Sequence, residues 1–192
     1  MRKKIGVLAL QGAFIEHIHM LEKLGATPVE IRQKSDFTPA LDGIILPGGE
    51  STVMGNLLHK TGLFEPLRNA LAEGLPALGT CAGLILMAKN AEDSAHKHLC
   101  VLGVTVRRHG FGRQINSFST EGDFAGQGQV PMVFIRGPYI TAVEDGVEIL
   151  ATAQDKIVAV RQKNLLGIAF HPELTGDTTV HEFFLKKVLT ND

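Results

Sequence analysis

The chain has 192 residues, 44% of them hydrophobic, and its 19 lysine and arginine residues nearly cancel 20 aspartate and glutamate residues. A chain of this length and composition can bury one sizeable core, so we expect a single domain over residues 1–192. The balanced charge creates no strong field toward nucleic acid or an anionic membrane, and neither is expected as a partner.

In chain order, the amino-terminal half alternates buried strands with helices. Residues 5–10 form the first apolar run, which is broken at Gln11 and Gly12 and is too short for a signal peptide or a membrane span. Apolar residues then recur at helical spacing until Gly25. Further strands are predicted at 29–31, 43–46 and 77–79, and helices at 52–60 and 64–73. Strands without polar alternation, separated by helices, predict a parallel sheet covered on both faces.

Beyond residue 100, closely spaced strand patterns favour antiparallel or mixed pairing. They cover residues 101–107, 132–136, 147–152, 157–161 and 165–170. A last helix at 180–188 presents one apolar face behind a capping box of Thr179 and Glu182, and the glycine-rich residues 122–128 are predicted to form a mobile surface loop. The predicted fold class is α/β, with three layers: an open, mostly parallel sheet flanked by helices, with additional antiparallel strands.

Cys81 carries the strongest chemical signal. It is the middle residue of Gly-Thr-Cys-Ala-Gly at 79–83, between a predicted strand and the apolar helix at 84–88. The flanking glycines allow backbone to pack where a Cβ would clash, so this turn lifts a nucleophile clear of the sheet, and the helix start favours the thiolate. Cys100 is interpreted as an inert, small apolar residue. Neither cysteine needs a disulfide in a chain with a good core, which favours the cytoplasm.

His171 and Glu173 supply a base and a group to orient it. They lie two residues apart, so in an extended segment the carboxylate of Glu173 can fix the tautomer of His171. The amide of Ala82, next after the nucleophile, is the expected first donor to an oxyanion. His-Pro-Glu alone is equally compatible with an ordinary turn, but the separate cysteine motif favours a Cys-His-Glu triad.

Several strings resemble those of class I glutamine amidotransferases and, within that class, the glutaminase subunits of pyridoxal 5′-phosphate synthase. They are the elbow around Cys81, Leu10-Gln11-Gly12, Pro47-Gly48-Gly49-Glu50-Ser51-Thr52, Phe111-Gly112-Arg113-Gln114, Phe134-Ile135-Arg136-Gly137-Pro138 and Phe170-His171-Pro172-Glu173-Leu174. The resemblance covers nearly the full chain. It implies hydrolysis of L-glutamine to glutamate and ammonia, with the ammonia passed to a (β/α)8-barrel synthase subunit in a large hetero-oligomer.

The resemblance also implies roles for individual residues. Gly49 would be the second oxyanion donor, and the residues around glutamine would be Gly48, Gly49, Glu50, Arg108, Ile135 and Arg136, with Ile135 acting through its backbone. Arginine suits the α-carboxylate because its planar fork can pair with both oxygens. We hypothesise that the amide of Gly49 points away from the substrate until the synthase docks. Gly137, where alanine is common in the family, is the one departure noted. No cofactor is expected in this chain.

Other interpretations of these residues remain open. His17, His19, His96 and His98 lack ligand spacing and are expected at the surface, so no metal site is predicted. Arg107 is interpreted as a solvated charge, and the same interpretation stays open for Arg108 and Arg113. Gln11 is interpreted as a neighbour of the site or of the synthase contact. The chain could serve a different synthase, for an imidazole or a purine, or act as a thiol sensor. Protection by glutamine against a glutamine-analogue electrophile would separate a glutaminase from a thiol sensor.

Overall fold

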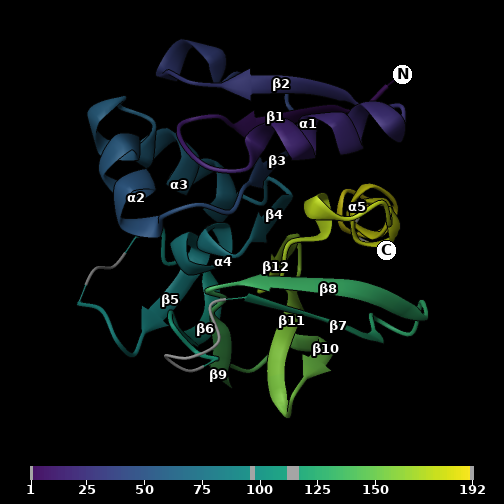
Figure 1. The fold of residues 1–192 in the computed structure, drawn as a ribbon. Coiled ribbons are helices and arrows are strands. Elements are labelled where there is room, and N and C mark those ends of the chain that lie inside the picture. Colours follow the sequence, from purple (N-terminus) through teal and green to yellow (C-terminus); the bar gives the residue numbers. More distant parts are fainter. Residues whose placement is uncertain (1, 96–97, 112–116, 191–192) are drawn as a thin grey trace.

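The computed structural model describes residues 2–95, 98–111 and 117–190. Within this part of the chain, ten strands form one mixed sheet and helices cover both of its faces (Figure 1). The strand order is β2-β1-β3-β4-β12-β11-β9-β6-β5, with β10 paired to β11, and β7 and β8 form a separate two-stranded sheet. The predicted α/β class, with an open sheet between helices and additional antiparallel strands, is confirmed.

The amino-terminal half follows the predicted alternation. Its elements are β1 (Lys4–Leu8), α1 (Phe14–Lys23), β2 (Thr27–Ile31), the short 3₁₀ helix η1 (Lys34–Asp36), β3 (Gly43–Leu46), α2 (Ser51–Lys60), α3 (Phe64–Ala72) and β4 (Ala77–Thr80). Strands β2, β1, β3 and β4 pair in parallel. Every residue of β3 and β4 is buried, which explains why these strands are apolar without alternation.

The direction of each crossover decides which face a helix covers. The chain steps from β1 to β2 toward one edge of the sheet and from β3 to β4 toward the other. Because such crossovers are right-handed, α1 lies on one face and α2 and α3 on the opposite face (Figure 1). The order of strands therefore reverses between β1 and β3, and open α/β sheets bind ligands beside such a reversal.

The carboxyl-terminal half is mixed, as predicted. It contains α4 (Ala82–Met87), β5 (Ala88–Ala91), β6 (Leu102–Arg107), β7 (Ser117–Asp123), β8 (Gln129–Ile135), β9 (Tyr139–Val143), β10 (Glu148–Ala153), β11 (Lys156–Gln162), β12 (Leu165–Ile168), the 3₁₀ helix η2 (Pro172–Leu174), α5 (Thr179–Phe183) and the π-helix η3 (Phe184–Val188). Strand β12 returns to pair in parallel with β4, while β11 is antiparallel to β12, β10 and β9. The patterns missed β5, β7 and β9.

The predicted surface loop at 122–128 is shorter than expected and is partly buried. Gly122 and Asp123 end β7, and Phe124 is completely buried. The Asp123 carboxylate accepts hydrogen bonds from the backbone N–H groups of Gly126 at 2.9 Å and Gly128 at 3.2 Å. The segment is thus a hairpin turn, anchored by an aromatic side chain in the core.

The carboxyl-terminal helix docks on the sheet as predicted, but its predicted cap is wrong. Thr178 precedes the helix and donates from Oγ1 to Glu182 Oε1 at 2.6 Å. The N–H of Thr179, already inside the helix, donates to Asp177 Oδ1 at 2.9 Å. The capping therefore begins with Asp177 and Thr178 instead of Thr179. In the described ranges no helix is long and apolar enough to cross a membrane.

Candidate active site

Four parallel strands deliver the predicted site residues to one edge of the sheet. Strands β1, β3, β4 and β12 are neighbours and run in the same direction, so their carboxyl ends lie together. Gln11 follows β1, Gly48 and Gly49 follow β3, Cys81 follows β4, and His171 follows β12. Residues separated by up to 160 positions in the sequence converge there because the sheet order, unlike the chain order, places these strands side by side.

Cys81 occupies a sharp turn between β4 and α4, as its motif predicts. Its φ of 50° and ψ of −103° lie in a region that non-glycine residues rarely adopt, and its residue is only 6% exposed. A Cβ on Gly83 would overlap the carbonyl oxygen of Leu46, and a Cβ on Gly79 would lie 2.7 Å from the Gly83 backbone. The two glycines therefore let the turn pack against the end of β3, which holds the cysteine in its unusual conformation.

His171 and Glu173 form a buried hydrogen-bonded pair. The distance from His171 Nδ1 to Glu173 Oε1 is 2.6 Å, and the His171 backbone N–H donates to the carbonyl of Val133 in β8 at 2.8 Å. The expected extended segment is replaced by the 3₁₀ helix η2, whose tight turn still brings the carboxylate to the imidazole. The predicted contact is confirmed, although the local conformation that makes it was predicted wrongly.

The charge state of His171 depends on its two neighbours. Burial alone would lower the pKa of His171, but hydrogen bonds to Cys81 and then Glu173, together with the negative charges of both, raise this pKa to about 10. At neutral pH the imidazole therefore holds its proton beside the sulfur. A protonated imidazole in this position can stabilise negative charge on a neighbouring sulfur by its charge and its hydrogen bond.

The Gly48–Gly49 segment lies against the imidazole and is held by the loop after β1. A Cβ on Gly48 would run into the ring of His171, so only glycine fits. The Gly48 carbonyl accepts from the N–H of Ala13 at 3.0 Å, and Gln11 Oε1 accepts from the N–H of Glu50 at 2.9 Å. Gln11 therefore contacts the segment that carries the predicted residues Gly48, Gly49 and Glu50.

Glu50 and Arg108, both predicted around the substrate, lie together at the start of α2. The Glu50 carboxylate caps this helix by accepting from the N–H groups of Thr52 at 3.1 Å and Val53 at 2.9 Å. Arg108 Nη2 lies 3.5 Å from Glu50 Oε1 and donates to Thr52 Oγ1 at 3.4 Å. Slight burial acts to raise the pKa of Glu50, but the Val53 and Thr52 amides and the Arg108 charge outweigh it and lower this pKa.

Ile135 and Arg136 mark the end of β8, where the sequence places Arg136 beside a turn. Ile135 is 44% exposed, and Arg136 has a positive φ of 46°. The N–H of Gly110, two residues after Arg108, donates to the carbonyl of Gly137 at 3.2 Å. The structure thus joins the segments that carry both predicted arginines. Gly112, Arg113 and Gln114 of the Phe-Gly-Arg-Gln string lie outside the described residues.

Two buried histidines were missed. The expectation that His17 lies at the surface is wrong, because it is completely buried against His181, whereas His19 is exposed. Position 17 lies three residues after Phe14 and four before Leu21, so helical spacing alone puts it on the buried face. His98 is half-buried, and His96 lies outside the described residues. The part of the chain that the structure describes contains no group of three or more His, Cys, Asp or Glu side chains that could hold a metal ion.

The remaining predictions concern the state of the two cysteines and the charge of Arg107. Cys81 and Cys100 are both free, and Cys100 is half-buried with its sulfur 3.8 Å from the carbonyl of Lys89. Arg107 is an exposed charge, as predicted, and pairs with Glu92 at 2.6 Å.

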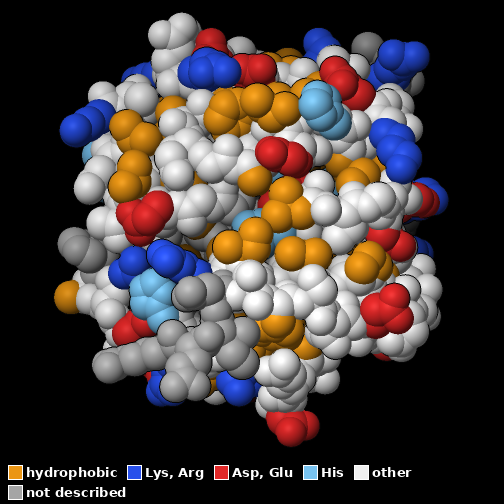
Figure 2. Space-filling view, viewed as in Figure 1, with side chains coloured by type: hydrophobic (Ala, Val, Ile, Leu, Met, Phe, Trp, Pro, Cys, Tyr) orange, Lys and Arg blue, Asp and Glu red, His pale blue; other side chains and the backbone are white. Residues whose placement is uncertain are grey.

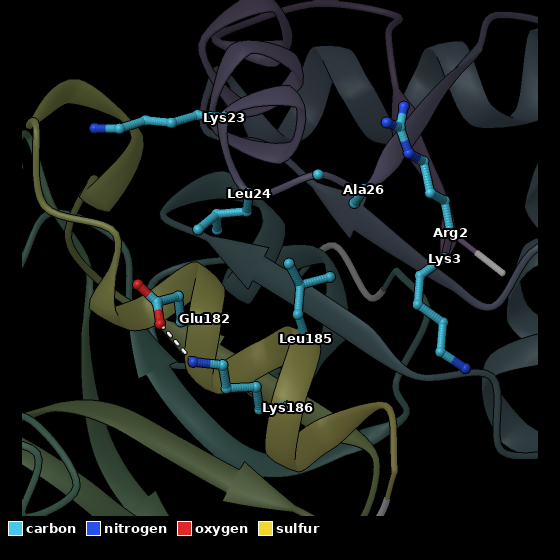
Figure 3. A pocket seen from close by; sticks show the side chains of 9 residues that line it. Arg2, Lys3, Lys23, Leu24, Ala26, Glu182, Leu185 and Lys186 are labelled. Carbon is cyan, nitrogen blue, oxygen red and sulfur yellow. Dashed lines mark hydrogen bonds and ion pairs between the residues drawn. The ribbon is translucent and has the colours of Figure 1, made fainter.

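A cavity of about 840 Å³ lies at the opposite edge of the sheet (Figure 3). It is lined by the start of β1, the end of α1 and the carboxyl-terminal helix, including Lys23, Leu24 and Leu185. The ion pair between Lys186 and Glu182, at 2.7 Å, spans part of its wall. None of the side chains drawn there belongs to the Cys81 edge, and size alone does not make this cavity the reaction site.

Comparisons with known proteins agree with this geometry. The model of the SNO glutamine amidotransferase family matches residues 7–190. The chain belongs to this family. It is therefore a glutamine amidotransferase, and the resemblance drawn from its motifs is confirmed at that level.

Relatives with functional names cover almost the whole chain. Pyridoxal 5'-phosphate synthase subunit PdxT of Streptococcus pneumoniae is 51% identical over 185 residues, covering 95% of this chain and 96% of that protein. The PdxT of Desulfitobacterium hafniense is 50% identical, covering 96% and 93%. A crystal structure of a glutamine amidotransferase superposes with a TM-score of 0.91 at 42% identity, covering 98% of this chain and 99% of that one.

Proposed function

We propose that residues 1–192 act as one glutamine amidotransferase domain, the glutaminase subunit of a pyridoxal 5′-phosphate synthase. It hydrolyses L-glutamine to L-glutamate and ammonia through Cys81, His171 and Glu173. The observation that carries this proposal is the buried His171–Glu173 pair beside the strained Cys81 turn. Relatives that share half of the residues bear the name of that synthase subunit, which favours it over an imidazole or purine synthase.

In the first half of the reaction, Cys81 attacks the side-chain amide of glutamine. The thiolate sulfur bonds to the amide carbon, and the carbonyl electrons move to oxygen. His171 then gives its proton to the amide nitrogen, the C–N bond breaks, and ammonia leaves a γ-glutamyl thioester on Cys81. Glu173 stabilises the imidazolium before transfer and keeps the remaining Nε2 facing the reacting atoms.

In the second half, water replaces ammonia. His171, now neutral, takes a proton from the water as its oxygen bonds to the thioester carbon. The tetrahedral intermediate collapses, the C–S bond breaks, and the thiolate–imidazolium pair is restored. The product leaves as the γ-carboxylic acid, which loses its proton to solvent to give glutamate. These two reaction steps conserve atoms and charge with the side chains of this chain and water as the reacting groups.

Each tetrahedral intermediate carries negative charge on the former carbonyl oxygen. We assign the N–H groups of Ala82 and Gly49 as its two donors. Ala82 begins α4 directly after the nucleophile, and Gly49 lies in the loop that packs on the imidazole. A single donor of this type typically contributes roughly 3–4 kcal/mol to stabilising the transition state.

Glutamine recognition is assigned to the groups around this loop. Arg108 and Arg136 are proposed to pair with the α-carboxylate, and Arg108 is already placed by Glu50 and Thr52. Glu50, with its carboxylate held at the start of α2, is available to an α-ammonium group. Gly48, Gly49 and the backbone of Ile135 would complete the pocket. Two arginines from adjoining segments give a geometry that lysines could not reproduce.

Exposed apolar side chains mark the proposed docking surface for the (β/α)8-barrel synthase subunit. Ile15, Val53, Ile135 and Leu174 are 41–51% exposed. The first two and Leu174 follow β1, β3 and β12, whereas Ile135 ends β8, the strand that binds the His171 backbone through Val133. In the view of Figure 2, apolar side chains gather around histidine atoms near the middle of the molecule. A partner seated there would receive ammonia before it reaches bulk water, in a cytoplasmic hetero-oligomer.

A partner bound to this surface could change the conformation of the Gly48–Gly49 loop. Ile15 lies two residues after Ala13, whose N–H holds the Gly48 carbonyl. Turning the Gly48–Gly49 peptide would break that hydrogen bond, a net change of about 1 kcal/mol. We propose that synthase docking shifts this balance, so that the Gly49 amide is directed at the oxyanion only in the complex.

The test is ammonia release from L-glutamine by the chain alone and mixed with a pyridoxal 5′-phosphate synthase subunit. Cys81→Ala serves as the control for the nucleophile. Strong stimulation on mixing is expected. Full activity of the isolated chain would overturn the gating proposal, and activity indifferent to this synthase would point to another acceptor. No ammonia from either preparation would overturn the glutaminase proposal.

A further inference from the structure

Only one oxygen of the Glu173 carboxylate is accounted for by the triad. Oε1 binds His171, whereas Oε2 is fully buried without a hydrogen bond in the described residues. A buried, ionised carboxylate oxygen needs a donor, because its lost hydration is otherwise uncompensated. The side-chain nitrogen recorded beside it is His17 Nε2, at 3.6 Å.

His17 belongs to a chain of buried polar contacts behind the triad. Its Nδ1 lies 2.8 Å from His181 Nε2, and its Nε2 lies 3.1 Å from Thr80 Oγ1. Both histidine side chains are completely buried. Thr80 is the residue directly before the nucleophile, so these contacts join the Cys81 strand to the loop that carries Glu173.

The contacts favour one arrangement of protons. If His181 Nε2 donates to His17 Nδ1, then His17 carries its own proton on Nε2, where it faces both Thr80 Oγ1 and Glu173 Oε2. The opposite arrangement would aim the lone pair of His17 at a carboxylate and leave a buried N–H on His181 Nδ1, which has no partner in the described residues. Orphaned buried N–H groups are rarer than orphaned acceptors.

Both imidazoles are held neutral. Burial, followed by the charges of His181 and His171, lowers the pKa of His17 well below its usual value, and burial lowers the pKa of His181 to about 4. The titratable groups that face His17 are His181, Glu173 and His171. A neutral donor satisfies the carboxylate without adding a cation that would compete with His171 for its charge.

We propose that His17 is a positioning residue, which holds Glu173 through a hydrogen bond from Nε2–H and whose own tautomer is fixed by His181. A movement of well under 1 Å would bring the 3.6 Å separation into hydrogen-bond range. With both oxygens engaged, Glu173 keeps a single orientation toward His171. This inference rests on the proposed function, since it concerns the orientation of the proposed base.

The experiment compares His17→Leu, His17→Gln and Leu21→Ala, all in a Cys100→Ala background. Leu removes the donor, Gln restores an N–H near the position of Nε2, and Leu21 is a fully buried apolar residue of the same helix with no part in the network. Iodoacetamide alkylation of Cys81 is measured against pH on the chain alone, and kcat and KM for glutamine are measured with the synthase subunit.

His17→Leu is expected to move the alkylation midpoint upward by about one pH unit and to lower kcat about 10- to 100-fold, with KM within about twofold. His17→Gln should recover most of this loss, and Leu21→Ala should keep the wild-type midpoint. A wild-type profile for His17→Leu, or the same shift in Leu21→Ala, would overturn the proposal.

A second measurement needs no variant. ¹⁵N NMR of the histidine rings in the wild-type chain should show His17 with its proton on Nε2 and a bare Nδ1. The opposite tautomer would overturn the inference even if His17→Leu fails to fold. Because NMR and alkylation require neither glutamine nor partner, they test the network separately from the proposed glutaminase activity.

Discussion

Replacing Glu173 by glutamine removes a charge from the buried pair while keeping its shape. In the wild type, burial lowers the pKa of His171, but Cys81 and then Glu173 raise it to about 10. A glutamine oxygen can still accept from Nδ1–H, so the imidazole keeps its orientation. What is lost is the charge that stabilises the imidazolium across 2.6 Å. The pKa of His171 should fall toward its ordinary value, and less thiolate should be present at neutral pH.

The magnitude follows from the same pair. The net rise in pKa from 6.5 to about 10 corresponds to roughly 5 kcal/mol, so Cys81 and Glu173 together supply more than this against the cost of burial. Losing one charge-assisted hydrogen bond removes about 1.5–3 kcal/mol of this, or a factor of roughly 10–150. Glu173→Gln should therefore lower kcat by about two orders of magnitude, with a smaller change in KM because the substrate does not contact this residue.

The assay is ammonia release by the complex at saturating glutamine, with alkylation of Cys81 followed against pH in the isolated chain. Glu182→Gln is the matched control, since its carboxylate lies at the surface and pairs with Lys186. The control should retain wild-type kcat. A Glu173→Gln variant with wild-type kcat and an unchanged alkylation profile would refute the reasoning that the carboxylate sets the charge of His171.

Three further outcomes are expected. Cys81→Ala should lower ammonia release at least 10³-fold with little change in melting temperature; retained release would contradict the assigned nucleophile. Ile15→Asp should weaken stimulation by the synthase about tenfold or more, whereas Ile149→Asp, exposed on β10, should not; equal loss would contradict the docking surface. Below pH 6.5 the unfolded chain protonates His181 and the folded chain does not until about pH 4, so folding stability should fall by up to about 1.4 kcal/mol per pH unit from this group. His181→Gln should flatten the dependence of folding stability on pH, measured by urea unfolding, whereas His19→Gln should leave it unchanged. The same pH dependence in His181→Gln as in the wild type would contradict the lowered pKa of His181.

The sequence predicts the parallel core and the sharp turn at Cys81 well, because both depend on local steric requirements. Buried parallel strands are apolar throughout, so β3 was located to the residue, and the glycines around Cys81 have one steric purpose that the structure bears out. The strand β7 was missed because one of its faces is polar and its partner pairing, not its composition, makes it a strand. The glycine-rich composition of residues 122–128 predicted a surface loop, but it surrounds Phe124, whose side chain is buried in the core.

The features that the sequence did not predict depend on contacts between segments far apart in the chain. Nothing local to His171 shows that the preceding strand, β12, pairs beside β4, because 84 residues of other structure separate Thr80 at the end of β4 from Leu165 at the start of β12. The missed histidines are a different case. Helical spacing places His17 on the buried face of α1. The surface prediction was instead based on the general tendency of histidine to be exposed, and it was therefore wrong. Its partner comes from the opposite end of the chain, and only the fold brings the two together.

The two buried imidazoles lie behind the carboxylate of Glu173, one of whose oxygens has no hydrogen bond within the described residues. A buried carboxylate oxygen without a donor costs free energy, and a second cation beside Glu173 would compete with the His171 imidazolium for the negative charge. A neutral imidazole avoids this conflict, since it donates a hydrogen bond and adds no net charge. Burial of His17 between Thr80 and His181 is what keeps it neutral. The apolar packing of α1 and α5 therefore contributes to the proposed chemistry by controlling the charge of a residue that never meets the substrate.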